Sequence, residues 1–141
     1  MAPPSAQTTS RLLGVAGLIP FVLPALLVVS DSTLAVAAKQ IAAGYALAII
    51  CFLSGSWWGM AQTSGVRATL ILSNLYLLLA IALYLVATEW WPLAATLLLS
   101  TALMCEQNKR LFPTCPPGYR RMRMLLTLGA AASMGVIQFA A

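Results

Sequence analysis

The sequence predicts an all-α integral membrane protein, a five-helix transmembrane bundle with its N-terminus cytoplasmic and its C-terminus outside. The first observation is composition: 61% of the 141 residues are hydrophobic and 8% are charged, too few polar side chains to cover a water-soluble globule. The second is that the apolar residues form five long runs, most of them long enough to cross a hydrocarbon core of about 30 Å. The third is the distribution of basic residues between those runs.

The basic residues predict the orientation of the helices. Of the eight, only Lys39 lies on one side of the five predicted crossings; the other seven, Arg11, Arg67, Lys109, Arg110, Arg120, Arg121 and Arg123, lie on the other. Short loops rich in Lys and Arg stay cytoplasmic. Because these cations are at span ends and the loops are too short for a binding module, the net charge of +5 does not indicate a nucleic-acid partner.

A polar, Pro-rich segment over residues 1–11 is expected to be a disordered tail, and residues 12–141 to be a single transmembrane domain. The first span is predicted over residues 12–30. Pro20 and Pro24 lie inside it and remove backbone donors, which predicts a kink whose freed carbonyls are satisfied by neighbouring groups. The alternative is a cleaved signal peptide, but the apolar run exceeds the usual length for one.

The remaining spans are predicted at about residues 40–61, 68–87, 91–107 and 120–139. Trp90 and Trp91 mark the outer interface after the third span, and Pro92 suits the first turn of the fourth. The fourth span is short. It can still cross if Lys109 and Arg110 extend back to the inner headgroups.

Small residues four apart predict where helices approach closely in a bilayer. Such spacings occur in the second and fifth spans, which are therefore the candidates for the packed centre of the bundle. Packing within one chain is favoured over a dimer face. The candidate packing residues are Gly44, Gly55, Gly59, Gly129 and Gly135.

Polar residues of four spans fall at similar depths, roughly 7 to 11 Å below the inner surface at 1.5 Å per residue. One interpretation is hydrogen bonding between helices. The other is a cytoplasm-facing pocket for a lipid, quinone or similar amphipathic ligand, although the two tryptophans also suit the inner aromatic belt. The candidate pocket residues are Ser54, Trp57, Trp58, Asn74, Thr101 and Thr127, with Ser100 at the same depth.

Glu106 lies just below this layer, where Arg123 or Arg120 can reach it, so we expect an interfacial ion pair of Glu106 with Arg123. No catalytic residue, metal site or cofactor is expected, because the chain has no His and no cluster of acids or Cys with ligand spacing. Cys51, Cys105 and Cys115 have no C-x-x-C spacing and are expected to be free thiols.

Three blocks carry a resemblance to a known family: LGVAGLIPF at residues 13–21, YALAIICFLSGSWWG at 45–59 and PGYRRMRMLLT at 117–127. They resemble the small membrane proteins called domain of unknown function 3429, whose animal relatives are transmembrane protein 69. The chain departs from the family blocks at Ser54, Trp57 and Gly118. The resemblance implies a multi-pass protein of the bacterial inner membrane, or alternatively of the mitochondrial inner membrane, with no established activity.

Three functions remain open, of which an enzyme that acts on lipid headgroups through Glu106 and Arg123 is the least supported, because the chain has no His base and no metal-ligand cluster. The first is a non-enzymatic accessory or assembly protein whose partners are the lipid bilayer and another membrane protein, as the small-residue faces and the lack of soluble domains suggest. The second is a binding protein for an amphipathic ligand in the inner-half pocket.

Overall fold

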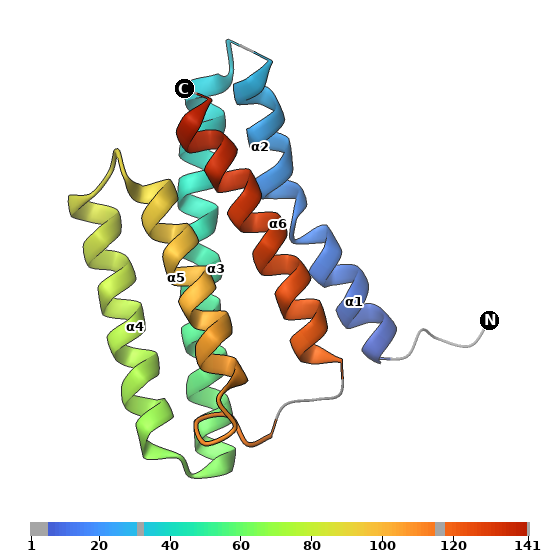
Figure 1. The fold of residues 1–141 in the computed structure, drawn as a ribbon, viewed down its shortest axis with the longest axis vertical. Helices are drawn as coiled ribbons and strands as arrows, with labels where there is room; N and C mark the ends of the chain where they lie inside the picture. The colour runs from blue at the N-terminus through green and yellow to red at the C-terminus, as the bar shows by residue number, and fades with distance from the viewer. Residues whose placement is uncertain (1–5, 31–32, 115–117, 141) are drawn as a thin grey trace.

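The computed structural model describes residues 6–30, 33–114 and 118–140. These ranges form helices without strands, which confirms the all-α prediction. The first two of the six helices in these ranges follow one another in a single broken rod, so the described helices make five rods (Figure 1). The helices are α1 (Ala6–Ala16), α2 (Ile19–Val29), α3 (Ala35–Ser64), α4 (Arg67–Val86), α5 (Trp91–Gln107) and α6 (Tyr119–Phe139).

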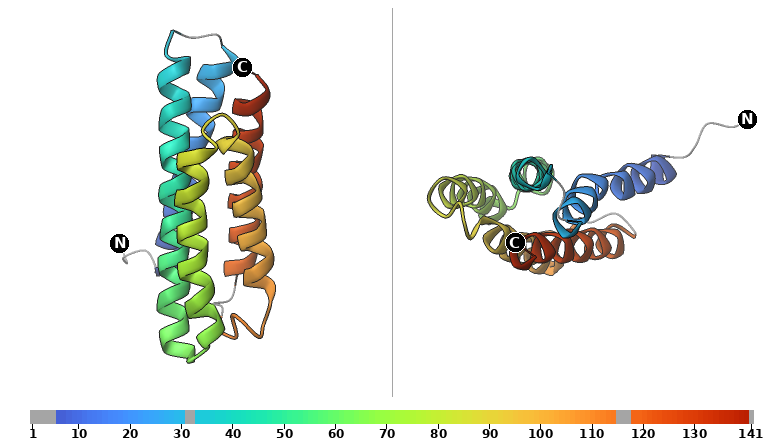
Figure 2. Two further views of the ribbon diagram at one scale, coloured as in Figure 1. Left: turned by 90° about the vertical axis from the view of Figure 1, so that its left-hand side faces the viewer. Right: turned by 90° about the horizontal axis from the view of Figure 1, so that it is seen from above.

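The rods close into a ring. Going round it, α2 packs on α3, α3 on α4, α4 on α5, α5 on α6, and α6 returns to α2 (Figure 2). Helix α3 also contacts α5 across the ring. We call the end at which α3 ends and α6 begins the basic end, because it carries every basic residue except Lys39.

Within the described ranges, four helical segments are long and apolar enough to cross a membrane: Thr8–Val29, Ala35–Ser64, Arg67–Val86 and Tyr119–Phe139. Helix α5 has 17 residues, about 26 Å at 1.5 Å per residue. The outward faces are apolar, as Phe52 at 71% and Val86 at 81% exposure illustrate. Apolar surface of this extent is suited to lipid, so the chain is a membrane protein.

The first rod is broken just before Pro20. The Phe21 N–H donates to Leu18 O rather than to Gly17 O, and this leaves the Gly17 carbonyl without its helical partner. The Tyr45 hydroxyl of α3 donates to that carbonyl at 2.9 Å. A neighbouring helix therefore supplies the donor that a proline-induced break requires.

Two expected boundaries differ from the structure. Residues 6–11, expected to be part of a disordered tail, are the start of α1, which packs against the beginning of α6. Gly14 is close enough to α6 that an added Cβ would lie 3.3 Å from Met122 Sδ, and this contact explains why the helix persists. Helix α3 begins at Ala35, five residues before the predicted span. The rest of the predicted tail lies outside the described residues.

Four of the five candidate packing glycines have no close neighbour among the described residues of this chain. A Cβ added at Gly129 would lie 3.0 Å from Leu18 Cδ2, but Gly44, Gly55, Gly59 and Gly135 have nothing within 4 Å of that position. Helix α6 packs on α5 and α2 rather than closely on α3. Alanines make the close approaches instead, among them the fully buried Ala42, Ala46, Ala80, Ala95 and Ala102.

Candidate functional site

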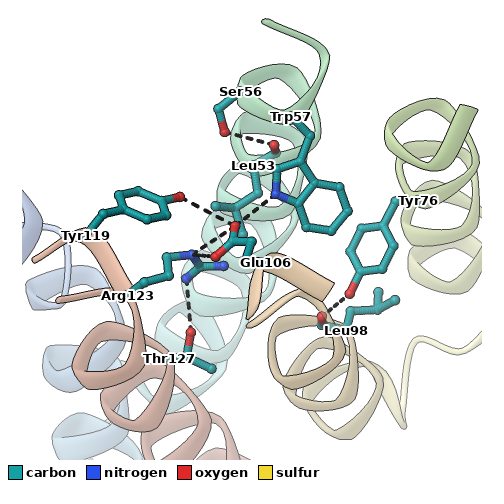
Figure 3. Close-up of polar contacts among 9 residues, drawn as sticks. All are labelled: Leu53, Ser56, Trp57, Tyr76, Leu98, Glu106, Tyr119, Arg123 and Thr127. Atoms are coloured by element: carbon teal, nitrogen blue, oxygen red, sulfur yellow. Dashed lines mark hydrogen bonds and ion pairs between the residues drawn. The ribbon is translucent and has the colours of Figure 1, made fainter. Parts of the chain in front are cut away.

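The most polar part of the interior is centred on Glu106, in the last turn of α5. Its carboxylate is buried with 1% exposure, and Arg123 in the second turn of α6 is buried beside it (Figure 3). Arg123 Nε lies 3.1 Å from Glu106 Oε2, while its N–H is directed at Oε1, 3.4 Å away. Both carboxylate oxygens therefore share the charge of one guanidinium.

Helix α3 and the first residue of α6 contribute further donors to Glu106. Trp57 Nε1 donates to Oε1 at 2.8 Å, and the Tyr119 hydroxyl donates to the same oxygen at 3.4 Å. The indole packs against the rings of Tyr76 and Phe112, with centroids 5.0 and 5.3 Å away. We call Trp57, Glu106, Tyr119, Arg123 and Thr127 the buried cluster; it joins α3, α5 and α6.

The buried cluster is not fully satisfied by its own side chains. Arg123 Nη1 donates to Thr127 Oγ1 at 3.0 Å. Arg123 Nη2 has no hydrogen-bond partner among the described residues, and neither does the buried Ser54 Oγ, one turn from Trp57 on α3. Glu106 Oε2 has the ion-pair contact with Arg123 Nε but accepts no hydrogen bond from them. Buried charges with unmade hydrogen bonds are costly, so this cluster contributes specificity of packing more than free energy.

The structure brings together only half of the candidate pocket residues. Ser54, Trp57 and Thr127 face inward, whereas Trp58 is 50% exposed and Asn74 and Thr101 are also exposed. The six do not surround one space.

The other polar side chains predicted to lie at this depth mainly form hydrogen bonds within their own helices. The Asn74 amide donates to Leu70 O at 2.9 Å, and the Ser100 hydroxyl donates to Thr96 O at 2.8 Å. Tyr76 hydrogen-bonds Thr101 and the Leu98 carbonyl between helices.

Glu106 and Arg123, expected from sequence to pair at the membrane interface, are in contact, and both side chains are buried between helices. Sequence reasoning missed Tyr119 and Tyr76 as members of this polar region. Tyr119 had a signal, because it directly precedes the arginines of α6 in a recognisable block. The signal for Tyr76 was weaker, because only the preceding Ser73 and Asn74 mark this part of an otherwise apolar span as polar.

A cavity of about 630 Å³ lies at the opposite end of the bundle from the buried cluster. Its walls come from the start of α3, the end of α4, the start of α5 and the end of α6. They combine charged, polar and aromatic side chains. The lining residues that bear polar or aromatic groups are Lys39, Gln40, Tyr84, Thr88, Glu89, Trp91 and Gln138.

The described residues contain no group of three or more potential metal ligands. Cys51 and Cys105 are free thiols, and Cys115 lies outside the described residues. Chemically, the buried cluster can fix three helices in register, and the cavity can hold a small polar group.

Comparison with known proteins identifies one similarity. Residues 6–139 match the family described as "Protein of unknown function (DUF3429)". Searches of curated proteins and of solved structures found no match.

Proposed function

Because the chain belongs to the DUF3429 family, whose function is unknown, we propose a role from the surfaces of the chain itself. The protein is a non-enzymatic accessory or assembly factor that binds one transmembrane helix of another membrane protein. The binding surface is the outward face of α3.

This face carries a stripe of small residues. At about 100° per residue, its members fall within about 60° of one another and point away from the buried face of α3. We call Ala37, Gly44, Ala48, Gly55 and Gly59 the small-residue stripe. Its length is about 33 Å at 1.5 Å per residue, enough to follow a partner helix across the bilayer.

The glycines of the stripe carry the proposal. Gly44, Gly55 and Gly59 have nothing within 4 Å of where a Cβ would lie, so no contact within the chain requires a glycine there. Glycine inside a helix costs about 1 kcal/mol relative to alanine. Close approach of a second helix is the usual gain that offsets this cost in a bilayer.

The stripe also limits the chemistry of the partner. Its members carry no charged or hydrogen-bonding side chain; Ile41 lies at the edge of the same sector and Phe52 just beside it, with 60% and 71% exposure. An apolar helix with its own small residues fits such a groove by van der Waals contact. A partner segment with ionisable groups at mid-membrane does not.

Photo-crosslinking in native membranes tests this function. A benzophenone amino acid at Phe52, beside the stripe, is expected to capture a distinct polypeptide, and Gly55→Leu should abolish the capture. The matched control is the same probe at Leu97, 66% exposed on α5, which should capture lipid only. A cross-link to a second copy of this chain, or none at position 52, would contradict the proposal.

The proposed setting is the inner membrane of a bacterium, with the basic end of the bundle in the cytoplasm. The seven cations at that end support this orientation by the positive-inside rule. In a cysteine-free background, a membrane-impermeant thiol reagent applied from outside should label Thr88→Cys and spare Thr63→Cys. The reverse pattern would invert the orientation.

The second function, binding of an amphipathic ligand in an inner-half pocket, has less support. Asn74 and Trp58 lie on the outer surface, so the residues that would have gripped such a ligand do not converge.

A further inference from the structure

The cavity at the end opposite the buried cluster contains two opposite charges that do not pair with each other. Lys39 lies in the first turns of α3 and Glu89 follows the end of α4, and both line the cavity. The described residues contain a single ion pair, that of Arg123 with Glu106. A cavity with separated positive and negative walls is complementary to a zwitterion.

We propose that this cavity binds the headgroup of a phospholipid bearing a primary amine, of the phosphatidylethanolamine class. The lipid phosphate lies against the Lys39 ammonium, and the lipid ammonium lies against the Glu89 carboxylate. The glycerol and acyl chains contact the apolar lining residues Leu85, Pro92 and Ile137.

Gln138 supplies the argument for a primary amine. Its Oε1 is buried and accepts no hydrogen bond from a described residue, and the side chain lines the cavity. A buried acceptor of this kind calls for a donor. A primary ammonium has three N–H groups and can serve Gln138 and Glu89 together, whereas a trimethylated ammonium has none.

The walls suit a lipid at the membrane surface rather than a soluble zwitterion. Trp91 is held in place by donating to Ala43 O at 3.0 Å and by an edge-on contact with Tyr84, 5.1 Å between centroids. Its neighbour Trp90 is 61% exposed, as expected of a residue at headgroup level. The 630 Å³ volume is within the usual range for a small-ligand site.

Lys39 is the one basic residue of eight outside the basic end. A cation there opposes the charge bias that sets the orientation of the other helices. Contact with a lipid phosphate gives that cation a role. The inference goes beyond the proposed helix docking, because the cavity and the small-residue stripe are separate surfaces.

Native mass spectrometry of the full chain in nanodiscs tests the proposal. The probes are phosphatidylethanolamine, phosphatidylcholine and phosphatidylglycerol with identical acyl chains. We expect retention of phosphatidylethanolamine to exceed that of the other two by about tenfold, the equivalent of one charge-assisted hydrogen bond.

Variants separate ligand contacts from structural effects. Gln138→Leu should remove the preference for phosphatidylethanolamine over phosphatidylcholine. Glu89→Gln should shift the preference toward phosphatidylglycerol, because the cation remains and the repelling carboxylate is gone. Lys39→Gln should lower the retention of all three lipids. Lys109→Gln, which replaces an exposed lysine at the basic end, should leave their retention unchanged.

Two results would overturn the proposal. One is a wild-type protein that does not distinguish the three lipids, or whose preference survives both Gln138→Leu and Glu89→Gln. The other is full displacement of the lipid by equimolar glycerophosphoethanolamine, which would identify a soluble zwitterion as the ligand. Neither result bears on cross-linking at Phe52, so failure here is distinguishable from failure of the docking function.

Discussion

Replacing the open glycines of α3 with alanine is expected to stabilise the isolated protein. Gly55 and Gly59 lie inside a 30-residue helix and have no atom within 4 Å of an added Cβ. Alanine at each site therefore restricts the backbone of the unfolded chain without a clash in the folded one.

The magnitude follows from helix propensity. Each Gly→Ala change in an exposed helix interior is worth about 1 kcal/mol, so the double variant should gain about 2 kcal/mol, roughly a thirtyfold change in the unfolding equilibrium. Gly129→Ala is the matched control, because its Cβ would lie 3.0 Å from Leu18 Cδ2. Displacing Leu18 should cancel most of the propensity gain there.

Reversible unfolding in mixed micelles, followed by far-ultraviolet circular dichroism against the mole fraction of dodecyl sulfate, measures these free energies. The reasoning also requires that the double variant bind the proposed partner helix less well, although it is more stable alone. It would be refuted if Gly129→Ala stabilised the protein as much as the α3 variants, because the α3 face would then not be distinguished by its openness.

Three further outcomes concern the polar interior, all measurable by the same unfolding assay. Glu106→Ala should lower the free energy of unfolding by about 3 to 5 kcal/mol, because it leaves the Arg123 charge buried without a partner. The double variant Glu106→Leu with Arg123→Met should recover most of that loss. A double variant no more stable than Glu106→Ala would contradict this account. Trp57→Phe should lower the free energy of unfolding by about 1.5 to 3 kcal/mol, because Glu106 loses a hydrogen-bond donor. Trp58→Phe, at an exposed position, should change it by no more than about 0.5 kcal/mol. Equal losses of stability in the two variants would contradict the role given to the buried cluster. Tyr45→Phe should lower the free energy of unfolding by about 1 kcal/mol, because it leaves the Gly17 carbonyl at the α1–α2 break without its donor. An unchanged unfolding midpoint would show that the Gly17 carbonyl accepts a hydrogen bond from another group.

The membrane fold could be predicted from sequence because its main signals are local. A long apolar run predicts a membrane span, and Pro20 predicts a break in the first helix. Both signals are read from contiguous residues of one segment. The sequence also indicated that Glu106 and Arg123 are within reach, because both flank the same connection between two helices.

The lateral arrangement could not be predicted in the same way. Depth along a span does not say which side of a helix a residue faces, and adjacent residues such as Trp57 and Trp58 differ by about 100°. One therefore lies inside the bundle and the other outside. Glycine spacing misled for a related reason: it marks surfaces that permit close approach, without saying whether the approaching helix belongs to the same chain.

The ring of helices has a consequence for how the protein is made. Helix α2 lies between α3 and α6, so it packs against a helix that is synthesised after α3, α4 and α5. Until Arg123 has been synthesised, the carboxylate of Glu106 lacks its counterion, and one flank of α2 remains uncovered. A nascent chain that stops before Tyr119 is therefore an incomplete bundle in which Glu106 has no cationic partner from α6.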